Sequence, residues 1–396
     1  MMQDDESNPT DPDDGLVTIP PVPPPSPLDV APTMADAYSW EDFLADSNRE
    51  LVSVADLPQQ SGLGEPLNDL LGGGLRAGQM VLIGARSAGA GKTAFLMQLA
   101  DGLAARTAEL VASGEPGPLT PVVIVSEMTP GDLTVRSVAR WTKTDNRIFR
   151  DKKRGGRNLA LQSAQAALEG GLGRARRYQR FLRVPAEGPD LVDQINGIVR
   201  AWREQRGLAG REVWPVVAID PVQRNAGGEN AIDGLDALSK AIRIMKNDHG
   251  FIVLLTSDTN TASARGQNRG GDAQQNAAAA IRGSYNLSHE VDVGMVLGRR
   301  EWAEGEQPVI EVDVYKNRWG TASPDPAATV VFDWEPAHLL LKPWTDEDMK
   351  ADRAEAEKER RRKREAKEQK DSKGDNVPVP GDSGDPYAQV KAKWND

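Results

Sequence analysis

Lys92 and Thr93 are the residues with the clearest chemical potential, and they follow Gly91 in the run from Met80 to Phe95. An apolar segment with strand character precedes them, and apolar residues at helical spacing follow. A strand, a glycine-rich turn, Lys-Thr and a helix form the pattern of a phosphate-binding loop. Backbone N–H groups can then face a polyphosphate, and the helix adds its positive end. We expect Lys92 to reach the β- and γ-phosphates and the Thr93 hydroxyl to hold Mg²⁺.

The glycines of this loop depart from the usual spacing by one position. Counted back from Gly91, the first glycine of the motif falls at Arg86, whereas Gly84 and Gly89 lie nearby. We therefore expect a loop that is one residue longer than usual. The residues expected to surround the phosphates, besides Lys92 and Thr93, are Gly84, Gly89, Ala90, Gly91 and Ala94. The alternative is a chance Gly-Lys-Thr in a surface turn, and the flanking strand and helix argue against it.

Two carboxylates stand at the ends of apolar runs further along the chain. Glu127 follows the run 121–126, and Asp220 ends the run 214–220. Short, continuous apolar runs of this kind are typical of buried parallel strands. Doubly wound sheets bind their ligands just beyond the carboxyl ends of such strands. We therefore expect Asp220 to orient the water shell of Mg²⁺, as the second acidic element of a nucleotide-hydrolysing core.

The order of the expected elements indicates an α/β fold, with a central, mostly parallel sheet flanked by helices. Strands are expected in the apolar runs 81–83, 121–126, 214–220, 251–257, 291–297, 309–315 and 329–332. Helices are expected at 94–112 and 233–247, and residues 131–206 are expected to be helical with many basic side chains. Those basic side chains fit solvated helix faces and a surface facing DNA or another subunit equally well.

The charge of the chain is concentrated in one segment. The formal net charge is −11, and residues 1–50 hold twelve acidic residues and a single basic one, so the remaining residues are formally neutral. The overall acidity therefore does not argue against nucleic-acid binding by the folded part. The chain has no cysteine and only three scattered histidines, which excludes disulfides and zinc held by cysteine. No run resembles a membrane span or a signal peptide, so we expect a cytoplasmic protein.

Composition divides the chain into four parts. Residues 1–56 are expected to be an acidic, proline-rich, disordered arm with a short docking helix around 37–46, and the folded domain is expected at 57–345. Residues 346–373 are nearly all charged and are expected to form an exposed helix, followed by a disordered tail at 374–396. The arm and the tail fit plain solubilising disorder, and they also fit binding to a partner.

Taken together, these residues resemble the RecA-like ATPase domain of the DnaB family of hexameric replicative helicases, over about 57–336. Besides the phosphate loop, four segments carry the likeness. Ile281-Arg282, leading into Glu290-Val291-Asp292-Val293, resembles the family's DNA-loop segment. Ser126-Glu127-Met128, with Leu133 and Arg136, is similar to the family's Ser-Leu-Glu-Met segment, and Asp220 with Gln223 matches its Asp-x-x-Gln element. Lys316-Asn317-Arg318-Trp319-Gly320 resembles its Lys-x-Arg-x-Gly finger, and this is the most specific match.

The resemblance implies a RecA-like P-loop NTPase core that uses ATP and Mg²⁺ and acts on single-stranded DNA in replication. It implies that Glu127 positions the attacking water, that Gln223 belongs to the nucleotide site, and that Lys316 and Arg318 enter the ATP site of the adjacent subunit. A homo-oligomer, expected to be a hexameric ring, follows from that shared site, and the tails are candidate contacts for a replication partner. The candidate DNA-binding residues of the central channel are Arg265, Arg269 and Arg282.

The sequence also departs from the family pattern. The family's glutamine sensor falls near Ser257, and its Arg-Glu pair in the DNA loop reads Arg282-Gly283. The family's N-terminal helical domain has no counterpart, and the acidic arm stands in its place. Two alternatives therefore stay open. One is a RecA- or RadA-like recombination or loading ATPase that binds DNA without unwinding it, and the other is a KaiC-like regulatory ATPase whose output is partner binding.

Overall fold

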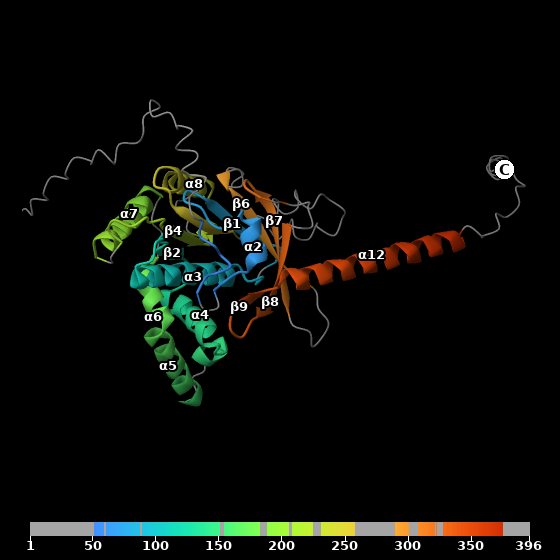
Figure 1. Ribbon diagram of the computed structural model, residues 1–396, viewed down its shortest axis with the longest axis horizontal. Coiled ribbons are helices and arrows are strands. Elements are labelled where there is room, and N and C mark those ends of the chain that lie inside the picture. Colours follow the sequence, from blue (N-terminus) through green and yellow to red (C-terminus); the bar gives the residue numbers. More distant parts are fainter. Residues whose placement is uncertain are drawn as a thin grey trace, which may run out of the picture. The chain divides into compact units, whose positions relative to one another are not determined.

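A mixed β-sheet organises the molecule (Figure 1). The computed structural model describes residues 51–58, 61–87, 89–150, 154–182, 188–205, 208–224, 231–257, 290–300, 308–320, 322 and 328–374, all within the unit Glu50–Asp396. Nine strands in these ranges form the sheet in the order β3-β2-β4-β5-β1-β6-β7-β8-β9. They are β1 (Met80–Ala85), β2 (Val122–Ser126), β3 (Gln179–Leu182), β4 (Val216–Asp220), β5 (Ile252–Thr256), β6 (Val293–Arg299), β7 (Val309–Asn317), β8 (Thr329–Glu335) and β9 (Leu340–Pro343).

The strands β3, β2, β4, β5, β1 and β6 pair in parallel, and β7, β8 and β9 continue the sheet in antiparallel pairs. Every residue of β1, β2, β4 and β5 is buried, which explains their unbroken apolar sequences. β7 alternates between buried and partly exposed residues, as expected where one face is only partly covered. The sequence therefore predicts the central strands well, because burial on both faces demands apolar residues throughout.

Helices cover both faces of the parallel part. The helices are α2 (Glu65–Leu70), α3 (Lys92–Ser113), α4 (Pro130–Thr142), α5 (Arg154–Glu169), α6 (Gly171–Ala175), α7 (Gly188–Gln205), α8 (Ala231–Asn247) and α12 (Asp346–Gly374), with short 3-10 turns at Asn146–Arg150, Arg176–Tyr178 and Val222–Arg224. Right-handed crossovers put α3 to α6 on one face and α7 with α8 on the other. Figure 1 shows α3 and α8 on opposite sides of β1 and β4. None of the described helices has the length and apolarity that a bilayer span needs.

Two strands differ from the expectation drawn from sequence. β3 (Gln179–Leu182) lies inside the segment 131–206, which was expected to be helical throughout, and β9 (Leu340–Pro343) was not expected at all. Both are short edge strands, and each has only two apolar residues in a row, Phe181-Leu182 in β3 and Leu340-Leu341 in β9, so neither has a continuous apolar signal. The packed region also includes Val52 and Val54, both fully buried, which precede the boundary expected near residue 57.

A buried ionic cluster joins α3, α4 and β3. Asp101 pairs with Arg140, and both side chains are almost completely buried. Gln179 Nε2 donates to Asp101 Oδ1 at 2.8 Å. Arg176 lies nearby, and burial lowers the pKa of its guanidinium while the charge of Asp101 opposes that shift. Asp101 is therefore the counter-charge for more than one buried arginine.

Asp101→Ala will lower the free energy of unfolding by about 3–5 kcal/mol, because it leaves a buried guanidinium without its partner. The measurement is urea denaturation followed by circular dichroism. The control is Asp193→Ala on α7, where the carboxylate is exposed, and its effect should stay within about 0.5 kcal/mol. Equal effects of the two substitutions would contradict the role given to Asp101.

Candidate functional site

The carboxyl ends of β1, β2, β4 and β5 meet at one edge of the sheet, because these strands run in parallel. In the register of the sheet, Ser126 lies opposite Asp220 and Ile83 lies opposite Thr256. The phosphate-loop segment after β1 and the two carboxylates predicted from sequence, Glu127 and Asp220, therefore gather at this edge. This is the position at which open α/β sheets bind ligands.

Thr93 and Asp220 are in direct contact. Thr93 Oγ1 lies 2.9 Å from Asp220 Oδ2 and 3.3 Å from Oδ1, and the hydroxyl of Thr256 donates to the same carboxylate. Asp220 is 4% exposed, and burial raises the pKa of its carboxyl, while hydrogen bonds from Thr256 and Thr93 and the charge of Lys92 act in the opposite direction. A cation at this position would relieve the cost of keeping the carboxylate charged.

The oxygen donors at this position fit Mg²⁺. A threonine hydroxyl and a carboxylate are the hard ligands that Mg²⁺ prefers, and Mg²⁺ commonly takes its other ligands from phosphates and water. In the described ranges no group of three or more His, Cys, Asp or Glu residues could hold a metal ion. The donor set of Thr93 and Asp220 therefore suits a metal that arrives with a phosphorylated ligand, and not a metal held by the protein alone.

The loop itself has the backbone that close phosphate approach requires. Gly91 begins α3 as its N-cap with φ of 94°, and Gly89 has φ of 74°, so both adopt the left-handed conformation that glycine tolerates. The first turn of α3 has no acidic residue and no side-chain cap, which leaves its N–H groups available to an anion. Within the loop Ala90 is buried, and Ala94 is buried in the first turn of α3. Gly84, by contrast, lies inside β1 opposite Val296, so its backbone belongs to the sheet.

Two arginines border this loop, and sequence reasoning did not assign either of them to the site. Arg86 is half exposed and pairs with Asp313 of β7. Arg299, at the end of β6, donates a hydrogen bond to the carbonyl oxygen of Gly89. The adjacent pairing of β6 and β1 brings Arg299 to the loop, and no local pattern around residue 299 could have indicated it.

Glu127 and Gln223 lie at the same edge. The Glu127 backbone N–H donates to the carbonyl oxygen of Asp220 at 3.3 Å, and its carboxylate, 47% exposed, lies 3.6 Å from Arg224 Nε. Gln223 Nε2 donates to Ser257 Oγ at 2.7 Å, which joins the segment after β4 to the end of β5. Glu127 is thus open to solvent beside a buried Asp220, so the two carboxylates have different surroundings.

Lys316 and Arg318 lie at the other end of the sheet. Asn317 pairs with Val293, and Val293 pairs with Val81 near the start of β1, whereas the loop follows the end of β1. From Val81 to Ala85 the strand rises about 13 Å, which is farther than an arginine side chain extends. Lys316 and Arg318 therefore cannot serve the phosphate loop of their own chain.

The buried carboxylate of Asp292 holds Arg318 in place. Arg318 Nη1 lies 3.1 Å and Lys246 Nζ lies 2.5 Å from its carboxylate oxygens, and Asp292 is only 1% exposed. Met80 N–H also donates to Asp292 Oδ2 at 2.8 Å, which ties the carboxylate to β1. Burial lowers the pKa of Lys316, and the charge of Arg318 lowers it further. Sequence reasoning missed Asp292 as the support of Arg318.

The turn after β7 is also fixed. The Asn317 side chain donates to the carbonyl oxygen of Leu70 at the end of α2, and Trp319 N–H donates to Asn317 Oδ1 at 3.0 Å. Trp319 is 41% exposed, with the Arg76 guanidinium 5.6 Å from its ring centroid.

The three remaining site candidates, Arg265, Arg269 and Arg282, lie outside the described residues.

Comparisons with known proteins agree with this arrangement. A family model described as "DnaB-like helicase C terminal domain" matches residues 61–335. A solved structure described as an "ATPase Domain" superposes with a TM-score of 0.56 at 16% identity, and covers 77% of this chain and 96% of that chain. A second, described as "The Structure Of A DnaB-Like Replicative Helicase And Its Interactions With Primase", gives a TM-score of 0.55 at 16% identity, over 78% of this chain and 68% of that chain. A search of curated proteins finds no match. The expected α/β, RecA-like core is confirmed.

Proposed function

Because this chain belongs to the DnaB-like helicase C-terminal domain family, we propose that it is an ATP-hydrolysing motor of the DnaB type. In this proposal the chain assembles into a ring, expected to be a hexamer, and moves along single-stranded DNA during replication. The observation that carries the proposal is the separation of two groups of residues. The phosphate loop, Glu127 and Asp220 lie at the carboxyl ends of the parallel strands, and Lys316 and Arg318 lie towards the opposite ends of these strands.

The residues at the carboxyl ends would bind ATP and Mg²⁺. Lys92 and the N–H groups of the loop from Gly89 to Gly91 would hold the β- and γ-phosphates, with Ala94 supporting the first turn of α3. Thr93 and Asp220 would hold Mg²⁺, which supplies counter-charge to the phosphates when bound. The existing contact between Thr93 and Asp220 supports this assignment, because the two side chains already face one position. Gln223 would be the remaining residue of the nucleotide site.

Glu127 would orient and deprotonate the water that attacks the terminal phosphate. A carboxylate in this role must be within reach of a water molecule and must keep its charge. Glu127 is half exposed, whereas Asp220 is buried against two hydroxyl groups. The different surroundings of the two carboxylates support a division of labour, with Asp220 serving the metal and Glu127 serving the water.

Lys316 and Arg318 would act on the nucleotide of the adjacent subunit. A cation supplied in trans that stabilises the transferring phosphoryl group is typically worth about 10³-fold or more in rate. The ion pair with Asp292 and the hydrogen bonds of Asn317 and Trp319 hold this segment in one geometry. Fixed cations of this kind need no reorganisation during the reaction. Their distance from the loop of the same chain supports the assignment to a neighbour.

Single-stranded DNA would pass through the centre of the ring. Arg265, Arg269 and Arg282 are the proposed contacts to its phosphates, because guanidinium groups neutralise the backbone without reading sequence. The acidic arm and the C-terminal tail are proposed to contact a replication partner. Displacement of a strand from a forked substrate would distinguish this motor from a loading factor that only hydrolyses ATP on DNA.

The test is the rate of ATP hydrolysis per subunit, measured against protein concentration with and without single-stranded DNA. We expect the rate per subunit to rise steeply as the protein assembles, because each pocket is completed by a neighbour. We also expect DNA to raise the rate further at low salt. A dilute, monomeric, DNA-free protein that turns over at the full rate would contradict the shared site. A rate that DNA leaves unchanged would favour a regulatory ATPase.

A further inference from the structure

Helix α12 (Asp346–Gly374) has an uneven charge distribution along its length. Its first twelve residues, 346–357, include six acidic and two basic residues, whereas residues 358–373 include nine basic and four acidic ones. Five consecutive cations occur at 360–364. A helix that only needed to stay in solution would mix the two signs evenly, because pairs of opposite charge three or four residues apart stabilise it. We call residues 358–373 the basic half of α12.

The acidic start of α12 is fixed to the sheet. Thr345 caps the helix, since its N–H donates to Asp348 Oδ2 at 3.0 Å and its hydroxyl accepts from Asp348 N–H at 3.2 Å. Met349 is 6% exposed. Arg300, which directly follows β6, holds both carboxylate oxygens of Asp352, at 2.7 and 3.0 Å, and this pairing raises the pKa of its guanidinium. The basic half therefore extends from an anchored base (Figure 1).

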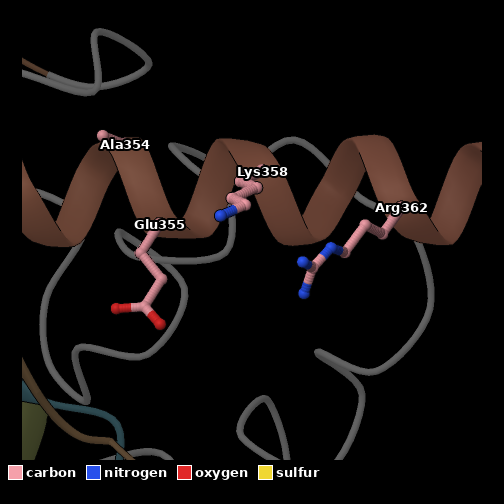
Figure 2. Close-up of a pocket in the computed structure, with 4 residues that line it drawn as sticks. All are labelled: Ala354, Glu355, Lys358 and Arg362. Carbon is pink, nitrogen blue, oxygen red and sulfur yellow. The ribbon is translucent and has the colours of Figure 1, made fainter.

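The basic half contains like charges that repel each other. Lys358 and Arg362 are exposed and lie one helical turn apart, where two cations destabilise a helix. Figure 2 shows their side chains on the same side of α12 as Glu355, lining a hollow that Ala354 also borders. Arg361 pairs with Glu365 at 2.9 Å, but both are largely exposed, so the pair contributes little. A polyanion would relieve the repulsion between Lys358 and Arg362.

We infer that the basic half of α12 is a binding site for the phosphate backbone of double-stranded DNA. Successive positions of a helix point about 100° apart, so the five cationic positions 360–364 surround the helix axis. A single strand would be contacted from one side only, whereas a helix in the major groove has phosphates on both sides. The groove admits an α-helix, and duplex DNA has about one negative charge per 1.7 Å. This inference goes beyond the proposed motor and does not depend on ATP hydrolysis.

The test uses the full chain without nucleotide. In one variant, Arg360, Arg361, Arg362, Lys363 and Arg364 are replaced by glutamine, which keeps a similar helix propensity. Fluorescence anisotropy measures binding to a duplex of roughly 20 base pairs and to a single strand of equal length, over a range of salt. We expect duplex affinity to fall at least about tenfold near 100 mM salt, and the salt slope to fall by about 3–5, because up to five phosphate contacts are lost. Single-strand affinity should change less than about threefold.

A second variant controls for charge. It replaces Arg360, Arg361, Arg362 and Arg364 with lysine, and should bind the duplex about as well as the parent, because phosphate contacts of this kind need charge and not shape. Unchanged DNA-free ATP hydrolysis and helical circular dichroism would show that the glutamine variant is folded. Equal loss for both DNAs, or no loss, would overturn the inference. So would tighter binding of the basic half to an added peptide of residues 1–50 than to the duplex at the same salt.

Discussion

Replacing Arg318 with alanine will lower kcat for ATP hydrolysis by about 10³-fold, while the Kd for ATP changes little. Nucleotide binding should survive, because the loop, Thr93 and Asp220 belong to the other edge of the sheet and stay intact. The substitution removes a charge that the neighbour's nucleotide needs in the transition state, and only there. Steady-state hydrolysis and equilibrium binding of a fluorescent nucleotide measure the two quantities on the same preparation.

Mixed assemblies make this prediction specific. Arg318→Ala and Lys92→Ala should each hydrolyse ATP very slowly alone, but the two mixed should regain activity. A pocket that combines the loop of the Arg318→Ala subunit with the cations of the Lys92→Ala subunit is complete. Arg203→Ala on α7 is the control, because Arg203 is an exposed arginine outside both edges, and its rate should stay within about twofold. Normal turnover by Arg318→Ala, or no recovery on mixing, would exclude a shared site.

The sequence predicts the parts of this fold that depend on local burial. The four all-buried parallel strands have unbroken apolar runs, and each was expected at nearly its observed position. The edge strands β3 and β9 were not expected, since an edge strand is defined by the neighbour with which it pairs and its own sequence need not be apolar. Short strands of four residues also leave too few positions for a periodic signal.

In the candidate site, too, some residues could be placed from local sequence patterns and others could not. The shared position of Thr93, Glu127 and Asp220 could be predicted, because each lies next to or at the end of a recognisable element and parallel strands bring their ends together. Arg299 and Asp292 could not, because Arg299 reaches Gly89 through the pairing of β6 with β1, and Asp292 reaches Met80 and Arg318 through the neighbouring strands β1 and β7. The opposite placement of Arg318 and the loop likewise becomes visible only when the register of β7 is known. Long-range register is the information that local patterns lack.

Replacing Glu127 with glutamine will lower kcat for ATP hydrolysis by about 10²–10⁴-fold, the contribution typical of a general base. The amide has nearly the shape of the carboxylate, so the exposed side chain at the end of β2 should keep its position. The affinity for ATP should stay within about threefold, because Glu127 contacts water and not the phosphates in this mechanism. Single-turnover hydrolysis separates the chemical step from nucleotide release.

Two further substitutions identify the cause of the lower kcat expected for Glu127→Gln. Glu109→Gln, on the exposed side of α3, should hydrolyse ATP at a rate within about twofold of the parent. Asp220→Asn should behave differently from Glu127→Gln, because it removes a charge that the Mg²⁺ site needs, and the concentration of Mg²⁺ required for half-maximal activity should rise. If Glu127→Gln also raises that concentration, Glu127 is a metal ligand. If it leaves kcat unchanged, another group activates the water, and the division of labour between the two carboxylates is wrong.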